Sequence, residues 1–155
     1  MRSVDNWLNE YSDSHRNPTN ELLHLVCVPA IVLAGLGFLW LLPVPALVAP
    51  LSPPLNWASL VVALTLGYYF TLSPRLALGM LPLLALGLWL VNALQHLPLP
   101  LWATCLAIFV IAWIGQFVGH AVEGRRPSFF KDAQFLLIGP LWLLSFAYRR
   151  LGLRY

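Results

Sequence analysis

Two histidines lie nine residues apart, where a polar N-terminal segment meets a long apolar run. They are His15 and His24, and they bound the sequence HRNPTNELLH. Neutral imidazole binds iron, zinc, copper and nickel, and polar side chains at the mouth of a membrane helix are costly and commonly functional. The spacing alone specifies no metal, so a candidate centre needs further ligands from elsewhere in the chain.

The composition is that of a membrane protein: of 155 residues, 59% are hydrophobic and 10% are charged. Apolar runs of about 17 to 25 residues are long enough to cross a bilayer as helices. Their continuous Leu-rich character lacks the alternation of barrel strands. We therefore expect an all-α, multi-spanning protein with one membrane-embedded domain over residues 1–155. The net charge of +3 is expected to set topology or meet lipid headgroups rather than bind nucleic acid.

The pattern predicts an interfacial helix over residues 3–14, followed by four transmembrane helices. One face of the interfacial helix is apolar and turns toward the membrane or the bundle; it carries Val4, Trp7, Leu8 and Tyr11. The first transmembrane helix should begin at Asn17-Pro18, because Asn suits the N-cap and Pro the first helical position. The four transmembrane helices are expected at about 20–40, 57–71, 76–94 and 101–119.

Two further segments are expected to be irregular. The proline-rich, uncharged residues 41–56 predict a loop close to the membrane. The apolar segment 133–148 is short for a crossing and is interrupted by Gly139-Pro140, so it predicts either a short fifth crossing or a re-entrant hairpin. Because the topology places Cys27 and Cys105 near opposite faces, we expect both to be free, packed thiols.

Counting the crossings indicates which histidines can meet. His15, His24 and His120 fall on one side of the membrane, and His96 falls on the other, roughly 30 Å away. The three-histidine side also carries all six basic residues outside the C-terminus, and the loops on the other side carry none. The six are Arg2, Arg16, Arg75, Arg125, Arg126 and Lys131. The positive-inside rule makes this side cytoplasmic. We therefore expect His15, His24 and His120 to converge there.

Other polar side chains are expected near these histidines. Asn20 precedes His24 by one helical turn and Gln116 precedes His120 by one turn, so each could orient a ring or contact a substrate. Three histidines, or two with a carboxylate, leave positions open at a metal for redox or Lewis-acid chemistry. The carboxylates within reach are Glu21, Glu123 and Asp132.

Several alternatives remain open at this point. The histidines could be interfacial residues of a non-catalytic membrane protein that binds or scaffolds lipid. Similar ligands also occur in zinc hydrolases, which need no O2. Arg125 and Arg126 could be a topology signal, or they could clamp a carboxylate or phosphate headgroup bidentately.

The blocks HRNPTNELLHLVCVP (15–29) and GQFVGHAVEGRRPSFFKDAQFLLIGP (115–140) resemble the two signature blocks of the membrane-embedded 2-hydroxy fatty acid dioxygenases. The fungal endoplasmic-reticulum member of that family acts in phytosphingosine breakdown. The resemblance covers essentially the whole chain, which lacks the longer C-terminal tail of fungal members. It implies a compact bacterial relative in the inner membrane.

The resemblance also implies an activity and a set of site residues. The reaction is α-oxidation, in which an iron(II) enzyme uses O2 to convert a 2-hydroxy fatty acid into a fatty acid one carbon shorter. His15, His24 and His120 match the family's motif histidines, which are implied to be metal-binding and catalytic. Asn20, Arg125 and Arg126 match motif positions that are implied to bind substrate. From their positions near the histidines, we expect Gln116, Glu123 and Asp132 to be supporting residues around the metal. The resemblance leaves the oligomeric state open.

Overall fold

The computed structural model describes residues 2–47, 49–51, 54–126 and 134–155. Over these residues the protein is all-α, as the sequence predicts, with six α-helices, one 3-10 turn and no strand. The helices are α1 (Val4–Ser12), α2 (Pro18–Trp40), α3 (Trp57–Leu72), α4 (Pro74–Leu94), α5 (Leu101–Glu123) and α6 (Phe135–Arg150), and the 3-10 turn η1 (Ala49–Leu51) lies in the proline-rich loop.

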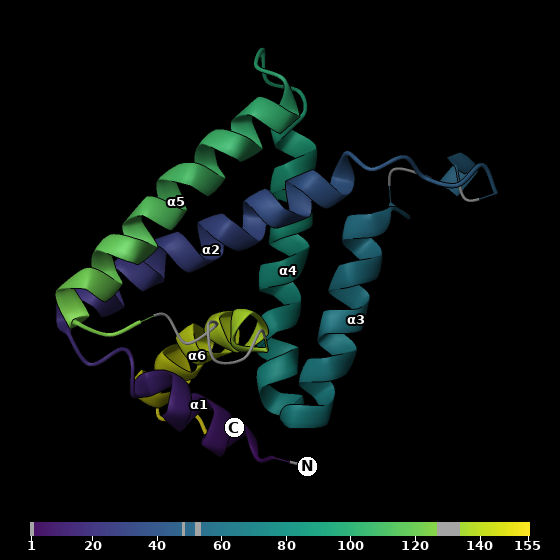
Figure 1. The fold of residues 1–155 in the computed structure, drawn as a ribbon. Helices are drawn as coiled ribbons and strands as arrows, with labels where there is room; N and C mark the ends of the chain where they lie inside the picture. The colour runs from purple at the N-terminus through teal and green to yellow at the C-terminus, as the bar shows by residue number, and fades with distance from the viewer. Residues whose placement is uncertain (1, 48, 52–53, 127–133) are drawn as a thin grey trace.

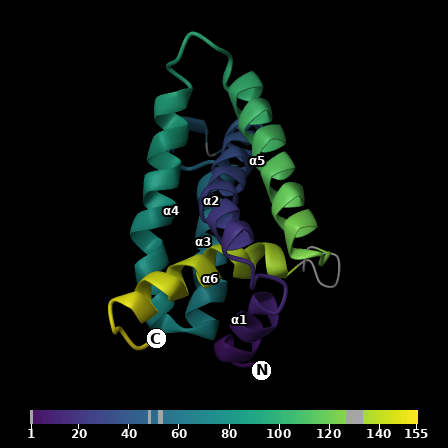
Figure 2. The ribbon, with the colours of Figure 1, turned by 90° about the vertical axis from the view of Figure 1, so that its left-hand side faces the viewer.

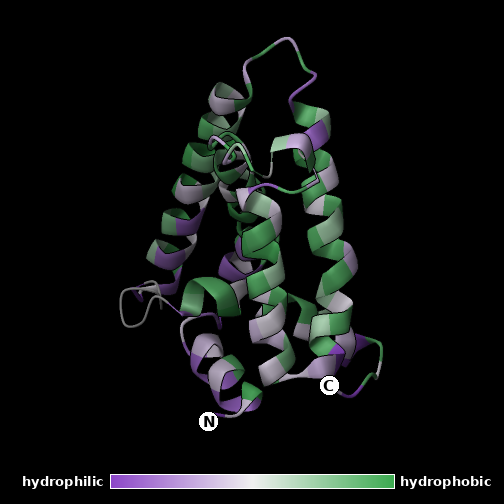
Figure 3. Ribbon diagram, turned by 90° about the vertical axis from the view of Figure 1, so that its right-hand side faces the viewer, coloured by the Kyte–Doolittle hydropathy of each residue, from purple (hydrophilic) through white to green (hydrophobic). Residues whose placement is uncertain are grey.

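Three helices, α2, α4 and α5, are long and apolar enough to cross a membrane. Helix α3 is apolar as well, but it has only 16 residues. Hydrophobic residues cover the long helices along much of their length (Figure 3). The chain therefore has the helices of a membrane protein, and the count of four spans stays a prediction.

Side-chain caps begin α2, α3 and α4. Asn17 is the N-cap of α2, where its side chain accepts a hydrogen bond of 2.9 Å from the Thr19 N–H and Pro18 takes the first helical position. This confirms the predicted start of the helix. Ser73 ends α3 and caps α4, so the two helices form a tight hairpin beside the rest of the molecule (Figure 1).

Helices α2 and α5 pack closely against one another, in opposite directions (Figure 1). Three glycines of this interface each face a side chain of the other helix: Gly37 faces Cys105, Gly115 faces Cys27 and Gly119 faces Asn20. A Cβ atom at Gly115 would lie 2.6 Å from Cys27 Sγ. The helices can therefore pack this closely only because the glycines have no side chain. Both cysteines are buried and free, as predicted.

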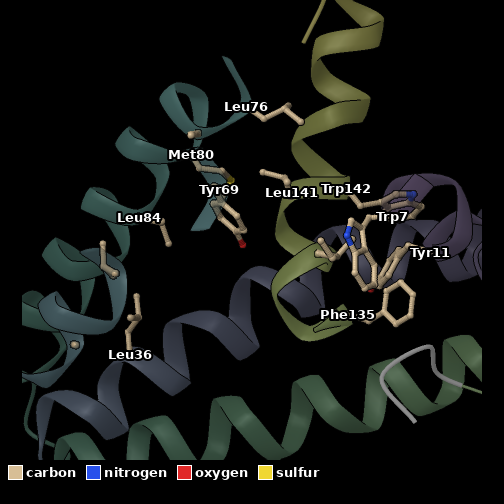
Figure 4. Packing of buried hydrophobic residues seen from close by; sticks show 14 of the residues in the cluster. Trp7, Tyr11, Leu36, Tyr69, Leu76, Met80, Leu84, Phe135, Leu141 and Trp142 are labelled. Carbon is tan, nitrogen blue, oxygen red and sulfur yellow. The ribbon is translucent and has the colours of Figure 1, made fainter. Parts of the chain in front are cut away.

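Helix α6 runs across one end of the bundle, transverse to α4 and α5 (Figure 2). Helix α1 packs against it (Figure 4). The Trp7 and Phe135 rings meet edge to face with centroids 5.3 Å apart, and Trp142 Nε1 donates a hydrogen bond of 2.7 Å to Ser12 Oγ. The apolar face of α1 is therefore buried against the bundle. The sequence had left open whether this face turns toward the membrane or toward the bundle.

The expected interruption at Gly139-Pro140 is wrong, because α6 continues through both residues. Proline lacks one N–H, but its φ is compatible with a helix. Gly139 allows another helix to pack closely against α6. A Cβ atom there would lie 3.0 Å from the Tyr11 hydroxyl oxygen, so the glycine makes room for α1. Whether this segment crosses the membrane or re-enters it stays a prediction.

The interlocked glycines predict unequal effects of Ala substitutions within α2. Gly37→Ala should destabilise the protein by about 1 to 3 kcal/mol, because its Cβ overlaps the buried Cys105 thiol. Gly35→Ala is the matched control, since no atom lies within 4 Å of its Cβ, and it should be neutral or stabilising. Unfolding in detergent measures both changes. The Cys105→Ala substitution should rescue Gly37→Ala, and equal stability of the two single variants would contradict this packing.

Candidate metal centre

The three predicted histidines lie where three segments meet. His15 follows α1, His24 lies in the second turn of α2, and His120 lies in the last turn of α5 (Figure 1). All three side chains are buried, with exposed fractions of 2%, 1% and 5%. Such burial of three imidazoles in one place is unusual for residues that merely anchor a protein at a membrane surface.

The imidazole rings converge on one point. One nitrogen from each ring can be chosen so that the three atoms lie within 4.8 Å of one another, and the Nε2 atoms of His15 and His24 are 2.9 Å apart. His96 is exposed and follows α4, which ends at the opposite end of the bundle (Figure 1). The predicted convergence of three histidines, without the fourth, is confirmed.

Backbone carbonyls determine which ring nitrogens face the centre. His15 Nδ1 lies 2.6 Å from the Tyr11 carbonyl oxygen, and His24 Nδ1 lies 2.9 Å from that of Asn20. Because a carbonyl can only accept, each Nδ1 carries the proton and each Nε2 presents a lone pair. Two lone pairs that face each other at 2.9 Å repel one another unless a cation binds to both. The donor set therefore fits a metal that imidazole binds, and iron(II) is one of these.

The surroundings of His15 keep its ring neutral. Burial, with a smaller contribution from the charges of His24 and His120, lowers the pKa of His15 to about 3. The Tyr11 ring stacks on the imidazole with a centroid distance of 4.2 Å and an angle of 6°. Tyr11 and its carbonyl thus hold His15 in one orientation and in the form that binds metals.

Glu123 ties the end of α5 to the turn before α2. Its carboxylate accepts hydrogen bonds from the backbone N–H groups of Arg16, at 3.0 and 3.1 Å, and Asn17, at 2.7 Å. It accepts a third from Asn20 Nδ2, at 3.2 Å. The carboxylate therefore positions the segment that carries His15 and His24, and it does so through the backbone rather than through the rings.

Asn20 and Gln116 both lie beside the histidines. Asn20 is fully buried, and its Nδ2 also donates to the Ser14 carbonyl at 3.2 Å, which holds the loop before α2. Gln116 is 6% exposed and lies one helical turn before His120 in α5. The Asn20 side chain therefore supports the loop before α2, and its carbonyl orients the His24 ring.

The predicted arginine pair lies outside the centre. Arg125 and Arg126 follow Gly124, which ends α5 with a φ of 70°, and both are exposed. The Arg125 N–H donates to the His120 carbonyl oxygen at 3.3 Å, so the pair begins one turn from the histidine. Their substrate role stays a prediction, and Asp132 falls outside the described residues.

A cavity of ≈ 60 Å³ lies against the centre, between α2, α5 and α6. His24, His120 and Gln116 supply its polar wall, and most of the remaining lining is apolar, including Ile31 and Leu136. Tyr11 also lines it, and sequence reasoning placed this residue only on an apolar helix face. Its spacing of one helical turn from His15 was the available signal.

Comparisons with known proteins identify the family of this chain. The family described as "2-hydroxy-palmitic acid dioxygenase Mpo1-like" matches residues 1–151. The chain is 31% identical to 2-hydroxy-palmitic acid dioxygenase MPO1 of Saccharomyces cerevisiae over 136 residues. The aligned region covers 86% of this chain and 73% of the yeast protein. No solved structure matches the chain. By its sequence, the chain belongs to the Mpo1-like family of 2-hydroxy-palmitic acid dioxygenases.

Proposed function

We propose that this protein is an iron(II)-dependent dioxygenase that converts 2-hydroxy fatty acids into fatty acids one carbon shorter by α-oxidation. The observation that carries the proposal is the buried cluster of His15, His24 and His120, whose ring nitrogens converge. The relative's activity, given by its name, supports the substrate class. Iron(II), when bound, supplies the redox chemistry with O2 that protein side chains lack.

The residues of the chain prepare this site in three ways. The three imidazoles hold the metal and leave positions open for ligands. The Tyr11 and Asn20 carbonyls fix the orientation of two of the rings. Packing of α1 and α6 over the centre keeps the histidines out of bulk water, which strengthens electrostatic interactions with a substrate.

The position of the site suits an amphipathic substrate. The wall of the cavity changes from polar at His24 and His120 to apolar at Ile31 and Leu136. The polar head of a fatty acid can therefore lie at the metal while the acyl chain extends between the helices toward lipid. We assign to Arg125 and Arg126 the role of attracting the carboxylate at the exposed end of α5.

The basic residues support a cytoplasmic site in a bacterial inner membrane. The described ones outside the C-terminal segment, Arg2, Arg16, Arg75, Arg125 and Arg126, are all exposed. Four of them lie in or next to the segments that carry the histidines, while Arg75 opens α4 at the same end of the bundle (Figure 1). Under the positive-inside rule, this end faces the cytoplasm.

Metal analysis distinguishes the proposal from its alternatives. After purification in detergent under anaerobic, reducing conditions, we expect about one iron per chain, because one set of three imidazoles binds one ion. A lipid-binding or scaffold protein would hold no stoichiometric metal. A hydrolase would hold zinc and act without O2, and either of those results would contradict the proposal.

Alanine substitutions test the assignment of the ligands. His15→Ala, His24→Ala and His120→Ala should each lower iron content several-fold and abolish turnover of 2-hydroxypalmitate, because each removes one of three converging nitrogens. Iron per chain and the shortened product are measured on the same preparations. His96→Ala is the matched control, since this exposed histidine lies at the other end of the bundle, and it should retain both properties. Loss of iron from His96→Ala alone would refute the site.

The burial of His15 predicts that stability of the metal-free protein depends on pH. The folded pKa is about 3, whereas an unfolded histidine titrates near about 6.5. The unfolded state therefore binds more protons between these values, and the free energy of unfolding should fall as the pH drops through 6.5. From pH 6.5 to 5 the loss from His15 is about 2 kcal/mol. The slope, measured by unfolding in detergent, should be shallower in His15→Gln; identical slopes would show that the ring is not buried neutral.

A further inference from the structure

The cavity beside the histidines contains hydrogen-bond donors that the ligand assignment does not use. Tyr11 is 6% exposed and lines this cavity together with His24 and His120. Its carbonyl bonds His15 Nδ1, whereas its hydroxyl bonds no residue in the described part of the chain. A phenol hydroxyl that reaches a cavity from a buried ring can donate a hydrogen bond to a ligand there.

The surrounding chain makes room for this hydroxyl. A Cβ atom on Gly139 would lie 3.0 Å from the Tyr11 oxygen and 3.7 Å from Val28. Stacking on His15, with ring centroids 4.2 Å apart, and contact with Trp142, at 5.1 Å, hold the Tyr11 ring on two other sides. The hydroxyl is therefore held in place at the wall of the cavity rather than left free to rotate into solvent.

A second donor lies in the same wall. Gln116 is 6% exposed, and its Nε2 is buried with no hydrogen-bond partner among the residues that the structure describes. Like Tyr11, it lines the cavity next to His24. No Asp, Glu, Lys or Arg lines this cavity within the described part of the chain, so its polar groups other than the histidines are neutral donors.

We propose that the Tyr11 hydroxyl and the Gln116 amide hold the polar head of the substrate by donating hydrogen bonds to its oxygen atoms. This inference rests on the proposed function and names the residues that touch the substrate's head. A 2-hydroxy acid offers carboxylate and hydroxyl oxygens, which accept from a phenol and an amide. Neutral donors suit a small, dry site, because the metal carries the charge that balances a carboxylate. The exposed Arg125 and Arg126 then act before the head reaches the cavity.

The test is binding of 2-hydroxypalmitate without turnover. Iron-loaded protein in detergent is titrated with this acid under anaerobic conditions by calorimetry. Tyr11→Phe retains the ring that stacks on His15, and Gln116→Met retains length and volume, so both variants should keep about one iron per chain. Each should weaken binding about 10-fold or more, because a buried donor to a charged group is lost.

Tyr69→Phe is the matched control. Tyr69 is 1% exposed, and its hydroxyl bonds the Leu137 carbonyl away from the cavity, so its loss should leave the dissociation constant within about two-fold of wild type. The proposal is overturned if both Tyr11→Phe and Gln116→Met bind like wild type, or if they lose iron and so act on the metal instead. A wild-type protein without iron refutes the proposed function itself, which separates the two failures.

Discussion

The close packing of α2 against α5 is the constraint on which the candidate site depends. His24 lies in the first turns of α2, and His120 lies in the last turn of α5. These residues meet only if the two helices are aligned lengthwise as they are here. Glycines that receive Cys105, Cys27 and Asn20 set this register along the interface. Interlocking of small residues suits a membrane, where lipid tails offer no hydrophobic drive for one helix to prefer another.

The third histidine depends on a different set of contacts. His15 lies between helices, so its position follows from the Glu123 carboxylate, which holds the Arg16 and Asn17 N–H groups, and from the Tyr11 ring and carbonyl. Helix α6 supports this arrangement from the other side, because Trp142 bonds Ser12 and contacts the Tyr11 ring. The N-terminal helix is thus part of the site and not only an anchor at the membrane surface.

Sequence patterns predicted the parts of this structure that depend on local chemistry or on counting. Asn17-Pro18 predicts the start of α2 because capping is local, and the Val4 to Tyr11 face predicts the buried side of α1 because its period is that of a helix. The convergence of His15, His24 and His120 follows from the number of crossings between them. These inferences need no knowledge of how the helices tilt or which side chains interlock.

Other features could not be predicted because they depend on packing between distant residues. Gly139 of α6 packs against the Tyr11 ring, and no pattern within residues 133–148 encodes that contact. Glu123 looked like a candidate partner of the metal, yet its oxygens accept from the backbone before α2. Tyr11 looked like one more apolar residue, and only the cavity places it beside His24 and His120.

X-ray absorption at the iron edge of the iron-loaded protein tests most directly whether the three histidines hold the metal. The account predicts nitrogen and oxygen neighbours with the outer-shell scattering of several imidazole rings. That scattering should decrease in a His120→Ala sample loaded with excess iron and stay unchanged in His96→Ala. A spectrum without imidazole scattering, or one that is the same in His120→Ala as in wild type, would contradict the account.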